Sequence, residues 1–276
     1  MKAKLFFLFT VFSISILKAQ PYSGVTVGFG MPGTWTVLGV NSERNDPANT
    51  FSNENVIGSY GRGFNFGVYV GDWVNEHVGI ELGINYLQGV KYTFTDNHVF
   101  SPNVSDNFED KVSAKSFRLA PGVRFGFGEN NIRPYMRAGV ALGIVNKITD
   151  HTTETFVNPG GTDIGITTFE YKKGLSVGFT SGVGVNFLIN DNCMFFVELS
   201  DYFISWAPTK GELTEATTNG ADQLGGMTTD EKQFEYVDKV DQTMNTSSGQ
   251  PRTQLKTYFP MSSFGLNVGV HFAFGG

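Results

Sequence analysis

Residues 263–274 read Ser-Phe-Gly-Leu-Asn-Val-Gly-Val-His-Phe-Ala-Phe, and their strict alternation decides the fold. One face of this stretch is apolar, and the other is small or polar and carries a single histidine, His271. A repeat of two residues places successive side chains on opposite sides of an extended chain, so the stretch predicts a β-strand, which we expect to run from about residue 258 to residue 274. About 10 residues are enough for a tilted strand to cross a bilayer.

Seven further stretches alternate in the same way, at residues 22–31, 63–72, 77–87, 116–127, 133–145, 174–189 and 193–206. Three connections between the eight stretches are short, at residues 73–76, 128–131 and 190–192, and four are long, at residues 32–62, 89–115, 146–173 and 207–256. A regular change between short and long connections is typical of a transmembrane β-barrel. The sequence therefore predicts a single eight-stranded antiparallel up-and-down barrel with short periplasmic turns and long extracellular loops. Pro121 lacks a ladder donor, so we expect a bulge or a local break there.

A soluble antiparallel sandwich or a lipocalin-like barrel is the alternative, and in that fold the apolar face would form the core. The opposite face favours the membrane barrel, because it consists mostly of Gly, Ala and Ser rather than the charged side chains that water would require. Small residues suit the crowded interior of a narrow barrel. The composition agrees, with 34 Gly and 26 Phe among 276 residues.

The N-terminal segment, residues 1–19, has the pattern of a secretory signal peptide that is removed. Lys2 and Lys4 precede an apolar run from Leu5 to Leu17, which is too short to span a bilayer as a helix. We expect cleavage after Ala19 and one barrel domain over residues 20–276. A single cysteine excludes an intramolecular disulfide. The net charge of −6 argues against a nucleic-acid partner.

Charged and strongly polar side chains interrupt the small-residue face, which predicts a polar layer in the barrel lumen. Its members are Glu81, Arg118, Arg124, Arg137, Asn186, Glu198 and His271. Buried charges need partners, so we expect Arg124 and Arg137 to be neutralised by Glu81 and Glu198. All members except Arg118 lie a similar distance from a short turn, which places them near one level. The interpretation is a lumen plugged by side chains, and the alternative is a proton or ion relay or a gate.

Aromatic residues near the strand ends predict two interfacial girdles, since membrane barrels carry aromatic residues at both bilayer surfaces. Trp73 and Tyr135 would belong to the periplasmic girdle, and Tyr86, Trp206, Tyr258 and Phe259 to the outer one. The alternative is that these residues are ordinary core aromatics.

No motif predicts an enzyme, a metal site or a cofactor. Residues 28–33 match G-x-G-x-x-G, but no βαβ unit follows, so the dinucleotide interpretation fails. The four histidines are scattered without ligand spacing, and no nucleophile motif is present. The long loops are polar and well hydrated, with room for a short helix capped near Thr228, and they are where an extracellular ligand would bind.

These features together resemble the small outer-membrane barrels of the OmpA and OmpX kind, and the porin-family or outer-membrane-protein beta-barrel domain proteins common in Bacteroidetes. The resemblance implies an integral protein of the cell outer membrane of Gram-negative type. It also implies contact with outer-membrane lipid and lipopolysaccharide, and a monomeric state. The final strand would be recognised by the barrel-insertion machinery through Val270, Phe272 and Phe274, although Gly275 and Gly276 follow the terminal aromatic residue.

Three functions remain open from the sequence. A structural or surface-interaction barrel is the first, a small passive porin or channel is the second, and an accessory barrel of a secretion system is the third.

Overall fold

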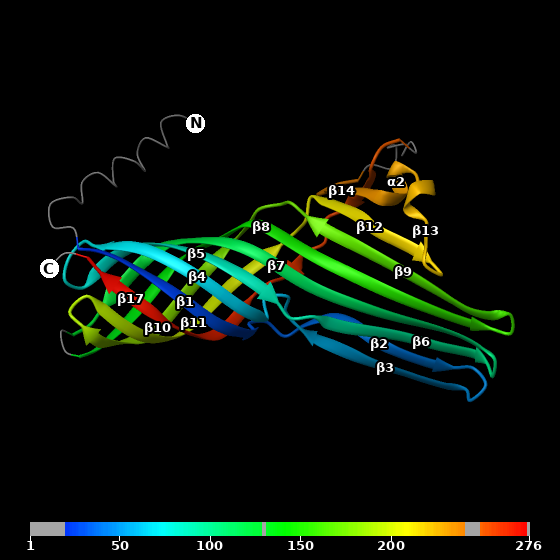
Figure 1. The fold of residues 1–276 in the computed structure, drawn as a ribbon, viewed down its shortest axis with the longest axis horizontal. Helices are drawn as coiled ribbons and strands as arrows, with labels where there is room; N and C mark the ends of the chain where they lie inside the picture. The colour runs from blue at the N-terminus through cyan, green and yellow to red at the C-terminus, as the bar shows by residue number, and fades with distance from the viewer. Residues whose placement is uncertain (1–19, 129–130, 241–248, 275–276) are drawn as a thin grey trace.

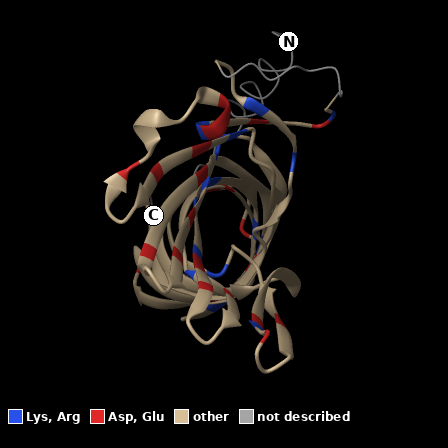
Figure 2. Cartoon of the chain, turned by 90° about the vertical axis from the view of Figure 1, so that its right-hand side faces the viewer, with Lys and Arg blue, Asp and Glu red and all other residues tan. Residues whose placement is uncertain are grey.

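A closed barrel forms one half of the protein (Figure 1). The computed structural model describes residues 20–128, 131–240 and 249–274. The barrel strands are β1 (Pro21–Pro32), β4 (Gly63–Trp73), β5 (Val78–Gly89), β7 (Val104–Gly126), β8 (Ile132–Asn158), β10 (Ser176–Asn190), β11 (Cys193–Trp206) and β17 (Ser263–Ala273). Each pairs antiparallel with the next, and β17 closes the ring on β1 (Figure 2). The predicted eight-stranded antiparallel barrel is confirmed.

The outer surface of the barrel is apolar, as a lipid-facing wall requires. Its exposed side chains include Val25, Val27, Phe64, Phe66, Val68, Val70, Leu82, Ile84, Phe117, Val123, Met136, Val140, Val177, Phe179, Val183, Phe187, Leu199, Phe203, Phe264, Leu266 and Phe272. These residues alternate with inward-facing ones along every strand, so the apolar face is the exterior. A soluble sandwich, which would bury the same residues, is excluded.

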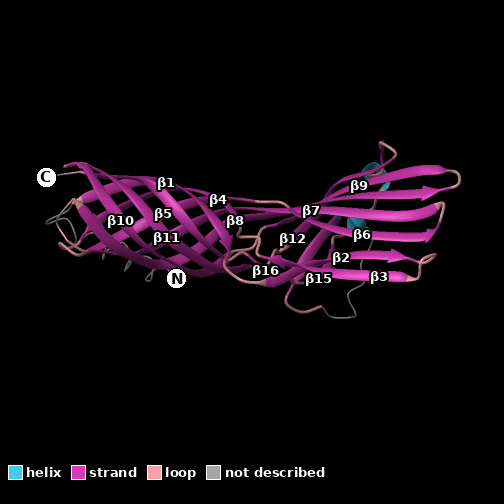
Figure 3. Ribbon diagram, turned by 90° about the horizontal axis from the view of Figure 1, so that it is seen from below, coloured by secondary structure: helices cyan, strands magenta, loops and turns pink. Residues whose placement is uncertain are grey.

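The long connections are a correction to the sequence analysis, because they fold into strands rather than hydrated loops. β7 and β8 continue past the ring and pair with further strands, namely β2 (Thr36–Asn45), β3 (Thr50–Gly58), β6 (Tyr92–Ser101), β9 (Gly161–Lys172), β12 (Lys210–Thr218), β14 (Gln233–Val237) and β15 (Arg252–Leu255). They form one sheet in the order β3-β2-β6-β7-β8-β9-β12-β14-β15, hereafter the outer sheet (Figure 3). The extended edges of β7 and β8 offer unpaired backbone groups, and the connections supply strands that pair with them.

The segment between β12 and β17 also holds the smaller elements β13 (Ala221–Asp222), η2 (Leu224–Gly226), α2 (Thr229–Lys232) and β16 (Phe259–Pro260). The short helix expected near Thr228 is α2. The Thr228 N–H donates to the Glu231 carboxylate at 2.7 Å, which satisfies one of the free donors at the helix start. None of the helices in the described residues is long and apolar enough to cross a membrane.

A bulge in β8 changes which side chains face inward. Phe117 pairs with Val145 and Arg118 with Gly143, so Ile144 is an extra residue in β8. Ile144 and Val145 both face outward, and Asn146 and Ile148 face inward beyond them. The expected irregularity at Pro121 is a local gap, because Ala120 and Pro121 are not paired with β8. The register shift lies nearer the outer sheet, at Phe117 and Arg118.

The predicted signal segment, residues 1–19, lies outside the described residues.

Candidate functional site

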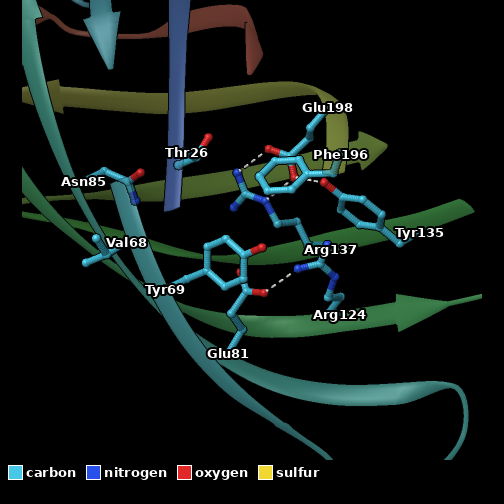
Figure 4. Close-up of a pocket in the computed structure, with 10 residues that line it drawn as sticks. All are labelled: Thr26, Val68, Tyr69, Glu81, Asn85, Arg124, Tyr135, Arg137, Phe196 and Glu198. Atoms are coloured by element: carbon cyan, nitrogen blue, oxygen red, sulfur yellow. Dashed lines mark hydrogen bonds and ion pairs between the residues drawn. The ribbon is translucent and has the colours of Figure 1, made fainter. Parts of the chain in front are cut away.

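Two ion pairs lie in the barrel interior and line the same small cavity (Figure 4). Arg124 Nη1 lies 3.0 Å from Glu81 Oε2. Arg137 binds Glu198 through two hydrogen bonds, Nε to Oε2 at 2.8 Å and Nη2 to Oε1 at 2.9 Å. The Glu198 carboxylate also accepts hydrogen bonds from Tyr135 Oη at 3.1 Å and from Asn267 Nδ2 at 3.2 Å. Each buried acid therefore faces one guanidinium and at least one further donor.

Aromatic rings hold Arg124 in place. Its guanidinium lies 3.8 Å from the centre of the Tyr135 ring and 5.5 Å from that of Tyr69. Two nitrogens of this guanidinium, Nε and Nη2, have no hydrogen-bond partner in the described residues. Cation–π attraction to the two rings offsets part of the cost of burying them. Tyr22 donates to Glu81 at 3.4 Å, and Tyr22, Tyr69, Tyr135 and Phe196 form one buried cluster.

Glycines of the small-residue face make room for these rings. A Cβ atom built at Gly24 would lie 2.3 Å from Tyr69, and one at Gly71 would lie 2.3 Å from Tyr22. Gly184 faces Tyr135 and Gly269 faces Phe196 in the same way. The glycine excess in the sequence thus has a local cause, because each ring of the cluster occupies the space of an absent side chain.

The space left between the ion pairs is a cavity of about 20 Å³, lined by both pairs together with Thr26 and Asn85. A cavity of this volume holds about one water molecule. It leaves no room for a substrate beside the two carboxylates. Among the described residues, no group of three or more His, Cys, Asp or Glu side chains is placed to hold a metal ion.

The other predicted lumen residues are buried but lie at different levels. His271 is below the ion pairs, where its Nδ1 lies 3.2 Å from Tyr69 Oη. Asn186 and His271 line a second cavity of about 130 Å³ at the barrel mouth that carries the short turns, beside Trp73. Arg118 is fully buried higher up, with its guanidinium 4.9 Å from the centre of the Tyr202 ring. The single level expected from the sequence is thus corrected for Asn186 and His271, because strand tilt separates positions that are equally far from their turns.

An apolar plug closes the outer mouth of the barrel. It consists of Tyr60, Leu87, Tyr92, Val112, Ala114, Ala141, Ile148, Tyr202, Ile204, Trp206 and Met261. Met261 lies in the segment just before β17. Its backbone N–H donates a hydrogen bond to Ile204 O at 3.0 Å. Trp206 Nε1 lies 3.1 Å from Lys173 O and 3.0 Å from Gly174 O. The barrel is therefore filled at its outer mouth as well as at the ion pairs.

The predicted girdles need correction. Tyr135, Trp206 and Phe259 face the interior, and Trp73 packs against the inner aromatic cluster. Only Tyr86, which stacks on the exposed ring of Phe117, and the exposed Tyr258 keep an outward position. Strand-end location was the wrong criterion, because Trp73, Tyr135 and Trp206 each share the parity of inward-facing neighbours. Phe272 and Phe274 of the final strand are exposed on the outer wall, and Val270 is half-buried.

Beyond the bulge, Asp150 lies on the inner face of the outer sheet near Asp110. Its Oδ1 atom is buried without a hydrogen-bond partner in the described part of the chain. Burial, and then the charge of Asp110, raises the pKa of Asp150 to about 6. Because this folded-state pKa lies above the ordinary value, the ionised form destabilises the fold, and that cost grows as the pH rises towards 6.

The closed strand ring and its apolar exterior define a membrane β-barrel protein. The sequence pattern of the Outer membrane protein beta-barrel domain family matches residues 5–205, and the chain belongs to this family. No curated relative matches the chain.

Several solved structures resemble the protein. Neisserial surface protein A is 9% identical, with 92% of this chain and 97% of that chain covered and a TM-score of 0.38. The outer membrane protein OprG from Pseudomonas aeruginosa is 11% identical, with 94% and 98% covered and a TM-score of 0.44. Ail, the attachment invasion locus protein of Yersinia pestis, is 11% identical, with 92% and 99% covered and a TM-score of 0.30.

Proposed function

We propose that this outer-membrane β-barrel protein has a structural or surface-interaction role in a Gram-negative cell envelope, and that the outer sheet faces the cell exterior. Residues 1–19 would direct export and then be removed, and the final strand, with Val270, Phe272 and Phe274, would be read by the insertion machinery. The observation that carries the proposal is the closed interior beneath a large folded outer sheet. A barrel without a path through it acts through its surfaces.

The tip of the outer sheet is the best-supported interaction surface. A cavity of about 290 Å³ lies on one face of β2. Its lining includes the aromatic residues Phe51, Phe100 and Phe108 and the acidic residues Asp96 and Asp106. A second cavity, of about 480 Å³, lies nearby and contains Glu43, Asn97 and Asn107. Both volumes are in or near the range of small-ligand pockets. Extracellular ligands are therefore expected at the tip rather than in the lumen.

The purified barrel should form no discrete ion-conducting openings in planar bilayers. The ion pairs and the apolar plug each close the lumen, and an eight-stranded barrel is only wide enough for its own side chains. Folded protein in the sample is verified by a shift in gel mobility on boiling. Stepwise openings that scale with the amount of folded protein would favour the passive channel instead.

The outer sheet should be reachable from outside intact cells. Thr162 lies at the exposed tip of β9, and Glu76 lies in the exposed turn at the opposite end of the barrel. In a Cys193→Ser background, a maleimide that cannot cross the outer membrane should label Thr162→Cys and spare Glu76→Cys. Labelling of Glu76→Cys alone would reverse the proposed orientation, and labelling of neither variant in intact cells would reject surface exposure. Lysed cells, in which both variants should react, serve as the control.

A further inference from the structure

Four lysines form a continuous row on the face of the outer sheet that continues the barrel exterior. Lys115 on β7 pairs with Lys147 on β8, Lys147 pairs with Lys172 on β9, and Lys172 pairs with Lys210 on β12. Their neighbours along each strand, such as Ser116, Ile148 and Tyr171, face the inner side, so the lysines face outward. We call these four residues the lysine row.

The lysine row lies where the lipid-facing surface ends. On the same face, the next residue towards the barrel is the exposed Phe117 on β7. On β8 it is the exposed Val145. Leu175, which follows β9, is also exposed on the barrel side of the row. The apolar wall therefore changes to a row of cations at one boundary. Figure 1 shows that β7 and β8 continue at this end of the barrel into the outer sheet.

The acidic partners of the row lie beside it or farther from the barrel. Lys147 pairs with Glu170, Lys172 with Glu212, and Lys210 with Glu235 at 3.6 Å. Glu170 and Glu212 are two residues farther from the barrel along β9 and β12. No acidic side chain of the described chain pairs with Lys115. The side of the row that faces the wall thus carries no described counter-charge.

Like charges directly opposite each other destabilise a sheet. Three glutamates pair with the four lysines of the row, so the row keeps an excess of positive charge that a further anion can neutralise. Neighbouring strands lie about 4.8 Å apart, and the four lysines therefore span about 14 Å of the boundary. Lysine ammonium groups bind phosphate as compact point charges. Anionic head groups at the surface of the bilayer are the anions that a row in this place would meet.

We propose that the lysine row binds the phosphate groups of anionic lipids in the outer leaflet. This inference rests on the proposed orientation of the barrel, in which the lysine row lies at the level of the lipid head groups of the outer leaflet. The phosphates occupy the wall-facing side of the row, while Glu170 and Glu212 hold the lysine side chains from the other side.

Titration of fluorescent lipid A into the folded protein in neutral detergent micelles tests the proposal, with energy transfer from the tryptophans as the readout. Each Lys→Gln change in the row should weaken binding about fivefold, and Lys115→Gln combined with Lys147→Gln about 25-fold. Lys115→Arg and Lys147→Arg should retain binding. Lys111→Gln is the matched control, because Lys111 lies on the same face of β7 four residues farther from the barrel, and it should change binding less than twofold. Lipid A without its phosphates should bind weakly to every variant.

Equal binding of lipid A by the double Gln variant and the wild type would overturn the inference. So would an equal loss in Lys111→Gln, which would indicate a general charge effect. Displacement of lipid A by polyglutamate at lower concentration would also overturn it and indicate an acidic polypeptide partner. Each variant is first checked for its boiling-dependent gel shift, and the Arg variants supply a folded comparison if a Gln variant fails to fold. The conductance and labelling experiments test the proposed function without lipid A. A failure of the proposed function can therefore be told apart from a failure of this inference.

Discussion

Glu198→Ala should lower the free energy of unfolding by about 3–5 kcal/mol, the cost typical of removing one partner from a buried ion pair. The change leaves the Arg137 guanidinium inside the barrel without a counter-charge. It also removes the acceptor of the hydrogen bonds from Tyr135 and Asn267. The loss is measured as a change in the midpoint of urea unfolding in detergent. The boiling-dependent gel shift reports the folded fraction at each urea concentration.

Two comparisons identify the cause of this loss. Glu212→Ala removes an ion pair with Lys172 in which both side chains are about one-third exposed, so its effect should be at most about 1 kcal/mol. Arg137→Met combined with Glu198→Ala should destabilise less than Glu198→Ala alone, because no unpaired charge stays buried. Equal effects of Glu198→Ala and Glu212→Ala, or a double variant less stable than the single one, would contradict the assigned role of the pair.

Trp206→Ala should lower the free energy of unfolding by about 3–5 kcal/mol, because it empties a fully buried site in the apolar plug. The change also leaves the carbonyl groups of Lys173 and Gly174 without their shared donor. The same urea titration measures the effect, with far-UV circular dichroism as the readout because tryptophan fluorescence is altered. The variant should still form no openings in planar bilayers, since the ion pairs close the barrel below the plug.

Trp35→Ala is the control for this change. Trp35 is 81% exposed, so its removal should alter stability by less than about 0.5 kcal/mol. If Trp206→Ala unfolds at the same urea concentration as Trp35→Ala, the outer mouth is not held by a packed plug.

The barrel could be predicted from the sequence because lipid outside and close packing inside impose opposite demands on alternate residues. The same rule indicated the inward face for Glu81, Arg124, Arg137 and Glu198. Applied consistently, it would also have placed Trp73, Tyr135 and Trp206 inside. The girdle prediction used their position near strand ends and disregarded their parity, and it was therefore wrong for these three residues.

Other features depend on contacts that local patterning does not encode. The extra residue at Ile144 reverses the parity of β8, so Asn146, Ile148 and Asp150 face inward. Gly143 lies next to the bulge, but it continues the series of glycines on the inward face and therefore does not mark the bulge in the sequence. Strands of the outer sheet carry polar side chains on both faces, which hides their period. The parallel pairing of β2 with β6 and of β14 with β15 joins segments far apart in the chain. Strand tilt likewise decided the separation of Asn186 and His271 from the ion pairs.

The unbroken course of β7 and β8 gives the protein a mechanical property. β8 is 27 residues long, and its last 12 residues, 147–158, extend about 40 Å beyond the boundary at the lysine row. No linker separates this arm from the membrane-embedded part of the same strand, so the arm cannot swivel independently of the barrel. A load applied at the hairpin between β8 and β9 is carried along the strands, where many ladder hydrogen bonds share it. Whatever binds at the tip is therefore held at a fixed distance from the barrel and in a fixed orientation to it.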